Sequence, residues 1–148
     1  MQNANVQAFL AMIRRFESNG DYNVLYGGGH FQDMSHHPDV HVPFYNPATG
    51  KDDYSTAAGA YQFNYPTWLE VQTVAALPDF SQSSQDIAAV WLLKIRGVLP
   101  DILAGNFDKA LQSASRIWAS LPGSTAGQNP QSYASAYNAY TGDGGTVA

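Results

Sequence analysis

Glutamate is rare in this sequence, and one of the two glutamates follows an apolar helical pattern. Only Glu17 and Glu70 are glutamates among the twelve acidic residues of the 148-residue chain. Glu17 comes after the apolar run VQAFLAMIRRF and before SNG, which is typical of a helix end. Burial beside a core and the negative end of a helix both raise the pKa of a carboxylic acid. Glu17 is therefore a candidate general acid, although a surface glutamate at a helix end would show the same pattern.

A second group of candidate residues lies in STAAGAYQFNYPTW, where a loop is predicted to become a helix. Gln62 can both donate and accept hydrogen bonds, as sugar hydroxyl and acetamido groups require. Tyr61 offers a flat ring with a polar tip, and the small residues before it would let a bulky ligand approach the backbone. The alternative is that GAYQF simply starts a helix, with Tyr61 and Phe63 in the core.

A cluster of histidines between residues 30 and 41 lies beside Asp33 and Asp39. Its members are His30, His36, His37 and His41. A zinc amidase would use such ligands. The segment HHPDVH is rich in loop-forming residues and lacks an established ligand spacing. We therefore expect neither a metal nor another cofactor.

The apolar periodicity predicts that these residues are positioned mainly by helices. Val6, Leu10 and Ile13 share one helix face with Glu17. Helices are predicted for residues 4–17, 65–76, 107–121 and 132–140, and for the apolar segment after DFSQSSQD. A short hairpin in YNVLYGGGHFQDM, followed by a Pro- and Asp-rich loop, predicts a small sheet within residues 22–56. The pattern indicates one α+β domain over residues 1–148, mostly helical with a small antiparallel sheet, and Trp91 and Trp118 are predicted core residues.

The composition excludes several classes of protein. Hydrophobic residues make up 45% of the chain and charged residues 13%, which indicates a globular protein. No apolar run reaches the length of a membrane span, and the N-terminus lacks a signal-peptide pattern, so we expect synthesis in a cytoplasm and no membrane insertion. The net charge of −5 argues against nucleic-acid binding. The absence of cysteine excludes a disulfide framework and thiolate chemistry.

Five motifs together resemble the phage lambda-type lysozymes, endolysins of the lysozyme-like superfamily that are lytic transglycosylases. The motifs are FLAMIRRFES, YGGGHFQDMSHHP, STAAGAYQF, DFSQSSQD and RIWASLPG with a later GQ, in matching order from Phe9 to Gln128. The resemblance implies a lysozyme-like α+β fold. It also implies cleavage of the β-1,4 bond between MurNAc and GlcNAc of peptidoglycan, with formation of 1,6-anhydro-MurNAc and lysis of the bacterium. Glu17 stands where this family has its single catalytic glutamate, and Tyr61 and Gln62 lie in a matched motif as substrate-binding residues. Tyr137 matches an aliphatic position of the family's last helix, so the resemblance implies that it is a core residue.

The resemblance has consequences for partners and location. The expected partner is the peptidoglycan glycan strand, and the protein is expected to act as a monomer. It would be made in the host cytoplasm and reach the cell wall through a separate pore protein. Two departures concern the lips of the cleft: the loop after Glu17 is shorter than in the family, and residues 46–55 are longer. In addition, Ala126 replaces an aromatic residue, so one stacking contact is expected to be missing.

Three classes of function stay open from the sequence. The first is a lytic transglycosylase, and the second is a hydrolytic muramidase, a virion-associated wall-degrading enzyme or a zinc amidase. The third is a wall-binding module without turnover, against which Glu17 in its helix argues. A hydrolytic glycosidase usually requires a second carboxylate. The candidates nearest in sequence are Asp21, Asp33, Asp52 and Asp53.

Overall fold

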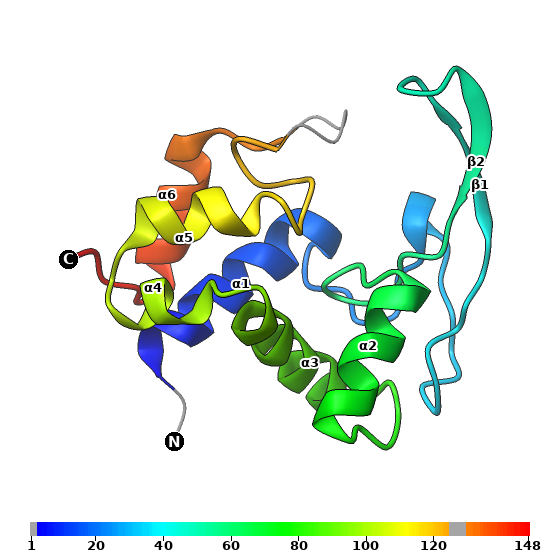
Figure 1. The fold of residues 1–148 in the computed structure, drawn as a ribbon, viewed down its shortest axis with the longest axis horizontal. Helices are drawn as coiled ribbons and strands as arrows, with labels where there is room; N and C mark the ends of the chain where they lie inside the picture. The colour runs from blue at the N-terminus through cyan, green and yellow to red at the C-terminus, as the bar shows by residue number, and fades with distance from the viewer. Residues whose placement is uncertain (1–2, 125–129) are drawn as a thin grey trace. The chain divides into compact units, whose positions relative to one another are not determined.

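The computed structural model describes residues 3–124 and 130–148, which divide between two compact units. Unit 1 consists of Met1–Glu17 and Val90–Ala148, and unit 2 of Ser18–Ala89. The described residues form six α-helices and one two-stranded antiparallel sheet (Figure 1), so the predicted α+β class is confirmed. A single domain over residues 1–148 stays a prediction. None of the helices in the described ranges is long and apolar enough to cross a membrane.

The helices and strands divide between the two units along the chain. Unit 1 contains nearly all of α1 (Ala4–Ser18), together with α4 (Leu99–Leu103), α5 (Phe107–Ala114) and α6 (Tyr133–Gly142). Unit 2 contains the 3-10 helix η1 (Tyr26–Gly28), β1 (Val42–Asn46), β2 (Lys51–Ser55) and α2 (Tyr65–Ala75). The helix α3 (Gln82–Ile95) begins in unit 2 and ends in unit 1.

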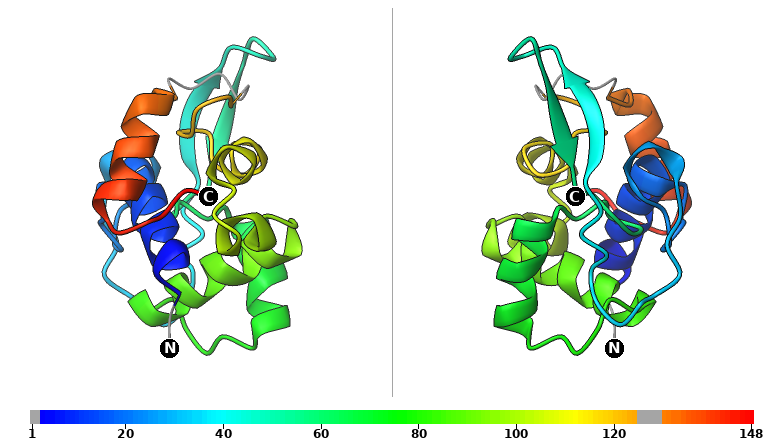
Figure 2. Two further views of the ribbon diagram at one scale, coloured as in Figure 1. Left: turned by 90° about the vertical axis from the view of Figure 1, so that its left-hand side faces the viewer. Right: turned by 90° about the vertical axis from the view of Figure 1, so that its right-hand side faces the viewer.

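Aromatic side chains form the core of unit 1. Phe9 of α1 contacts Phe107 of α5 edge-on, with ring centroids 6.3 Å apart, and lies 6.2 Å from Tyr140 of α6. Phe107 and Tyr140 stack at 4.5 Å. This packing places α6 alongside α1 (Figure 2). Trp118 is buried as predicted, whereas Trp91 is only half-buried. The prediction for Tyr137 was wrong, because this residue is 37% exposed.

The sheet of unit 2 lies in a segment that the sequence predicted to be a loop. β1 pairs with β2 from Val42↔Ser55 to Asn46↔Lys51, and the hairpin extends away from α2 (Figure 1, Figure 2). The hairpin predicted in residues 22–34 is only a single bridge, Val24↔His30, around η1. Pro43 argued against a strand in the sequence, because proline lacks a backbone N–H. Both strands of a two-stranded sheet are edge strands, however, and an edge strand tolerates proline.

Candidate active site

Glu17 occupies the last turn of α1 and is half-buried. The buried face of this helix, which includes Phe9, Met12 and Ile13, anchors it in the core. Burial raises the pKa of the Glu17 carboxyl group, and the hydroxyl and backbone N–H of Ser120 act in the opposite direction. Because burial is the larger effect, the carboxyl group holds its proton to a higher pH than an exposed glutamate does. This is the property of a general acid.

Ser120 is the residue that sequence reasoning missed beside Glu17. It lies in the turn after α5, within the motif IWASLPG, and its carbonyl accepts a 2.7 Å hydrogen bond from the backbone N–H of Gln131. Its side chain is buried. The motif was used only as a mark of resemblance, since nothing local in it indicates which side chain faces a glutamate on α1.

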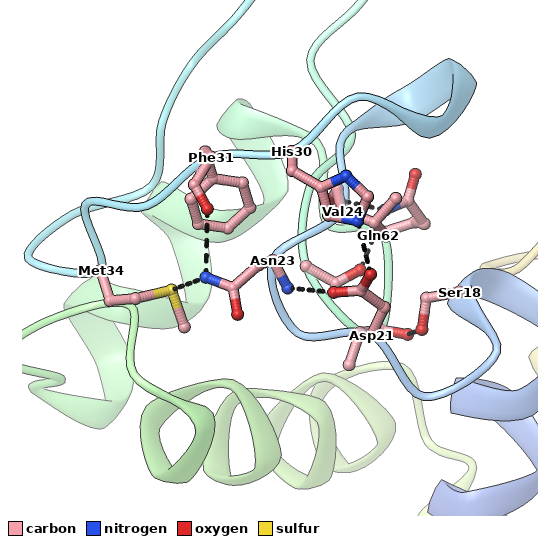
Figure 3. A network of polar contacts seen from close by, with 10 residues as sticks. Ser18, Asp21, Asn23, Val24, His30, Phe31, Met34 and Gln62 are labelled. Carbon is pink, nitrogen blue, oxygen red and sulfur yellow. Dashed lines mark hydrogen bonds and ion pairs between the residues drawn. The ribbon is translucent and has the colours of Figure 1, made fainter.

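The residue after Glu17 is tied to the backbone of the glycine-containing turn 58–63. The hydroxyl of Ser18 donates to the carbonyl of Ala60 at 2.8 Å (Figure 3). The N–H of Ala60 in turn donates to Oε1 of Gln85 at 2.9 Å. Gln85 is fully buried, and its amide group donates to the carbonyls of Tyr22 and Phe80. Ser18, the first residue of unit 2, is therefore connected by a hydrogen bond to the turn that carries Tyr61 and Gln62.

The Tyr61 side chain is 0% exposed. Its hydroxyl donates to Oδ1 of Asp86 at 2.6 Å, and the Tyr22 hydroxyl donates to the same oxygen at 2.7 Å. The ring packs on Phe63 with centroids 5.6 Å apart. The structure thus gives Tyr61 the packing position that the sequence left open as the alternative. Sugar contact by Tyr61 stays a prediction.

Gln62 is half-buried and has a positive φ of 49°. Its side-chain amide donates to the carbonyl of Gly59 at 2.9 Å and to that of Val24 at 3.2 Å. These bonds occupy the donor end of the side chain and fix its orientation. Sugar contact by Gln62 also stays a prediction.

Gln85 and Asp86 are two further residues whose roles the sequence did not reveal. Both lie in the motif DFSQSSQD. In α3 their side chains reach the turn 58–63: Gln85 binds its backbone, and Asp86 binds the Tyr61 hydroxyl. Helical spacing could place the pair on α3, but their partners are remote in sequence.

The carboxylate of Asp21 is held by its own loop. It accepts hydrogen bonds from the backbone N–H of Asn23 at 2.8 Å and from Nε2 of His30 at 2.7 Å (Figure 3). The Asn23 side chain donates to the Phe31 carbonyl and to the Met34 sulfur. The hydrogen bond from Asn23, followed by that from His30, lowers the pKa of Asp21. Asp21 is therefore an ionised part of the loop that follows α1.

The four histidines do not share one site. His36 pairs with Asp33 at 3.5 Å and His41 with Asp39 at 3.3 Å, separately from the pair of His30 and Asp21. No group of three or more potential metal ligands was found within residues 3–124 and 130–148. The histidine cluster of the sequence is therefore a set of separate surface pairs, together with the buried His37.

Comparison with known proteins decides the family. A family model described as Endolysin matches residues 7–147, nearly the whole chain. The chain belongs to the endolysin family. It is 34% identical to the endolysin of Escherichia phage P2 over 157 aligned positions, covering 97% of this chain and 95% of that protein. It is 37% identical to the endolysin of Escherichia phage lambda over 150 positions, covering 95% and 92%.

Solved structures of bacteriophage lambda lysozyme show the same fold as this endolysin-family chain. The structure of that lysozyme complexed with a chitohexasaccharide matches with a TM-score of 0.88 at 37% identity, covering 100% of this chain and 99% of the other. A second lambda lysozyme structure gives a TM-score of 0.80 at 34% identity and the same coverage. The predicted resemblance and the lysozyme-like fold are confirmed. The chain is a lysozyme-type enzyme that acts on peptidoglycan. The predicted loss of an aromatic contact at Ala126 lies outside the described residues.

In this endolysin-family chain, His37 stabilises unit 2. It is buried, its Nε2–H donates to the Phe63 carbonyl at 2.7 Å, and its Nδ1 accepts from the N–H of Asp39 at 3.0 Å. Its ring contacts Phe80 edge-on at 5.0 Å. These contacts require the neutral imidazole, because a proton on Nδ1 would remove the acceptor for Asp39. Burial accordingly lowers the pKa of His37.

We expect the free energy of unfolding to decrease as the pH falls below about 6.5, the pKa of an unperturbed histidine. Between that value and the lower pKa of folded His37, the unfolded chain binds more protons, so acid favours unfolding by about 1.4 kcal/mol per pH unit. Urea unfolding between pH 5 and pH 8 measures this slope. His37→Gln should flatten it, whereas His36→Gln, a change at an exposed neighbour, should not. An unchanged slope in His37→Gln would assign the acid sensitivity to other groups.

Proposed function

We propose that the chain is a lytic transglycosylase, a phage endolysin that cleaves the β-1,4 bond between MurNAc and GlcNAc and forms 1,6-anhydro-MurNAc. Glu17 acts as both the acid and the base of the reaction. The observation that carries this proposal is the half-buried position of Glu17 at the end of α1, where burial raises the pKa of its carboxyl group. A carboxyl group with a raised pKa keeps its proton to a higher pH and can give that proton to the leaving oxygen.

The reaction requires only one carboxyl group. Glu17 gives its proton to the glycosidic oxygen as the bond from that oxygen to C1 of MurNAc breaks. The Glu17 carboxylate then takes the proton of the C6 hydroxyl of the same MurNAc, and the C6 oxygen bonds to C1. The result is a 1,6-anhydro ring, an intact GlcNAc hydroxyl and a protonated Glu17, with no water consumed. An intramolecular nucleophile has a high effective concentration, so a second carboxylate is not required.

The acidic residues near Glu17 in sequence do not share its environment, and the product of the reaction decides whether one of them acts as a second catalytic group. Asp21 and Asp33 have lowered pKa values: hydrogen bonds from Asn23 and His30 hold the first, and hydrogen bonds from Ser35 hold the second. Asp52 and Asp53 lie on the exposed strand β2. Their environments are thus those of solvated or hydrogen-bonded carboxylates, which differ from the environment of Glu17.

The proposed substrate is the glycan strand of peptidoglycan. The similarity to a lysozyme solved with a chitohexasaccharide supports a glycan ligand, since that compound is a chain of β-1,4-linked sugars. We further propose that Tyr61 and Gln62 contribute to the sugar site. Gln62 has its amide nitrogen occupied by backbone carbonyls, so its side-chain oxygen is the group suited to accept from a sugar hydroxyl.

The proposal includes the route to the substrate. We propose that the enzyme acts as a monomer on the wall and is released from the host cytoplasm through a separate pore protein. Its relatives in phages P2 and lambda are endolysins, which act at the cell wall. Lysis from within host cells should then depend on co-expression of a pore-forming protein.

The product of the reaction tests the mechanism. We expect digestion of purified sacculi to release muropeptides whose MurNAc ends are lighter by one water than hydrolysis products. Borohydride should not reduce these ends, because the anhydro bridge removes the reducing group. Mass spectrometry before and after borohydride treatment measures both properties, with a hydrolytic lysozyme digest as the control. Reducible, fully hydrated MurNAc ends as the main product would instead identify a hydrolytic muramidase that retains Glu17 as the acid.

A further inference from the structure

The side chain of Ser120 is a buried polar group that lacks a hydrogen bond of standard geometry within the described residues. It is 8% exposed, and its hydroxyl oxygen has no hydrogen bond of standard geometry to any residue that the structure describes. Buried hydroxyl groups are normally hydrogen-bonded, because an unpaired one destabilises the fold. A serine that remains unpaired at such a position requires an explanation outside packing.

The backbone around Ser120 is fixed, which determines where its donors point. Trp118 and Leu121 on either side are buried in unit 1, and the N–H of Leu121 donates to the Trp118 carbonyl at 3.2 Å. The carbonyl of Ser120 is occupied by the N–H of Gln131. The two remaining polar groups of Ser120, its hydroxyl and its backbone N–H, both act on the carboxyl group of Glu17 and lower its pKa.

We propose that Ser120 is a positioning residue that holds the Glu17 carboxylate, with its hydroxyl and backbone N–H, between the two proton transfers of the reaction. This inference rests on the proposed role of Glu17 as acid and base. After Glu17 has protonated the leaving oxygen, it carries a negative charge in a half-buried site. Two donors from one rigid turn stabilise that charge and keep the carboxylate oriented for the C6 hydroxyl.

Burial and Ser120 have opposite effects on Glu17, and the reaction requires both. Burial favours the protonated acid, whereas the two donors of Ser120 favour the carboxylate. Within the described chain, no charged side chain contributes to the pKa shift of Glu17; its causes are burial and Ser120. The hydroxyl of Ser120 makes no hydrogen bond of standard geometry in the described chain, and catalytic hydrogen bonds often tighten only in a substrate complex.

A pair of serine variants separates this role from packing. Ser115 is also buried in unit 1, but its hydroxyl donates to the Gln112 carbonyl at 2.7 Å. We expect Ser120→Ala to lower kcat by about 10-fold, with little change in KM and no decrease in melting temperature, because it removes an unpaired hydroxyl. Ser115→Ala should show the reverse: a lower melting temperature and unchanged kcat. Wild-type kcat in Ser120→Ala would overturn the proposal.

The pKa of Glu17 gives a direct readout that a structural role would not change. Because the chain contains only two glutamates, labelling with glutamate carrying ¹³C at the carboxyl carbon gives two signals, and Glu17→Gln assigns them. The pKa of Glu17 should rise further in Ser120→Ala, and the alkaline limb of the kcat/KM profile should move to higher pH with it. Ser115→Ala should leave both unchanged, and an unshifted Glu17 signal in Ser120→Ala would contradict the inference.

The same variants distinguish failure of this inference from failure of the proposed function. If Glu17→Gln retains activity, Glu17 is not the catalytic acid and the proposed function fails. If Glu17→Gln is inactive while Ser120→Ala has wild-type kcat and an unshifted pKa at Glu17, only the role of Ser120 fails.

Discussion

Glu17→Gln is expected to lower kcat by about 10²–10⁴-fold while the fold and the binding of glycan strands persist. The amide has nearly the shape of the carboxyl group but can neither protonate the leaving oxygen nor take the proton of the C6 hydroxyl. Both proton transfers of the proposed reaction are therefore lost at once. Turbidity of a suspension of sacculi measures the rate, sedimentation with the sacculi measures binding, and thermal unfolding measures the fold.

The second glutamate of the chain provides a matched control. Glu70 is exposed on α2, so Glu70→Gln makes the same chemical change at a position outside the proposed machinery. Its rate should equal that of the unmodified protein. Clearing of sacculi by Glu17→Gln at the rate of Glu70→Gln would refute the assignment of Glu17 as the acid.

The position of Glu17 could be predicted from sequence because it depends on local periodicity. The spacing of Val6, Leu10 and Ile13 predicts both the helix and the face on which Glu17 lies, and the structure places α1 at Ala4–Ser18. Ser120 could not be predicted as its neighbour, because the two residues meet only through packing between distant segments of unit 1. A sequence pattern indicates that a side chain is buried but does not identify what it faces.

Aromatic residues show the same limit. Tyr61 could be read as a sugar platform or as a core residue, and its burial depends on Asp86, whose partnership with the Tyr61 hydroxyl has no local signal. Tyr137 was predicted in the core from its place in the last helix, yet it lies at the surface against Tyr133, with ring centroids 6.1 Å apart. In each case the residue type was compatible with both environments, so long-range packing decided between them.

Gly59, in the turn 58–63, is a position at which the structure requires glycine. Gly59 has a φ of +83°, a conformation that strains any residue with a Cβ. A Cβ at this position would also overlap Oε1 of Gln85 and lie 2.9 Å from Cδ of the same side chain. Gln85 cannot move away without breaking its hydrogen bonds, which run to Ala60, Tyr22 and Phe80.

We therefore expect Gly59→Ala to reduce the free energy of unfolding by about 3 kcal/mol or more, as the sum of backbone strain and a disrupted buried hydrogen-bond network. For a chain of this size, that loss corresponds to a fall in melting temperature of roughly 6–12 °C. Gly97→Ala is the matched control, because Gly97 has a similar φ of +77° but nothing within 4 Å of the added Cβ. It should show the strain alone, about 1–2 kcal/mol. If the free energy of unfolding falls equally in the two variants, the Gln85 side chain can move at no energetic cost. Gln85 would then not stabilise the turn that contains Tyr61 and Gln62.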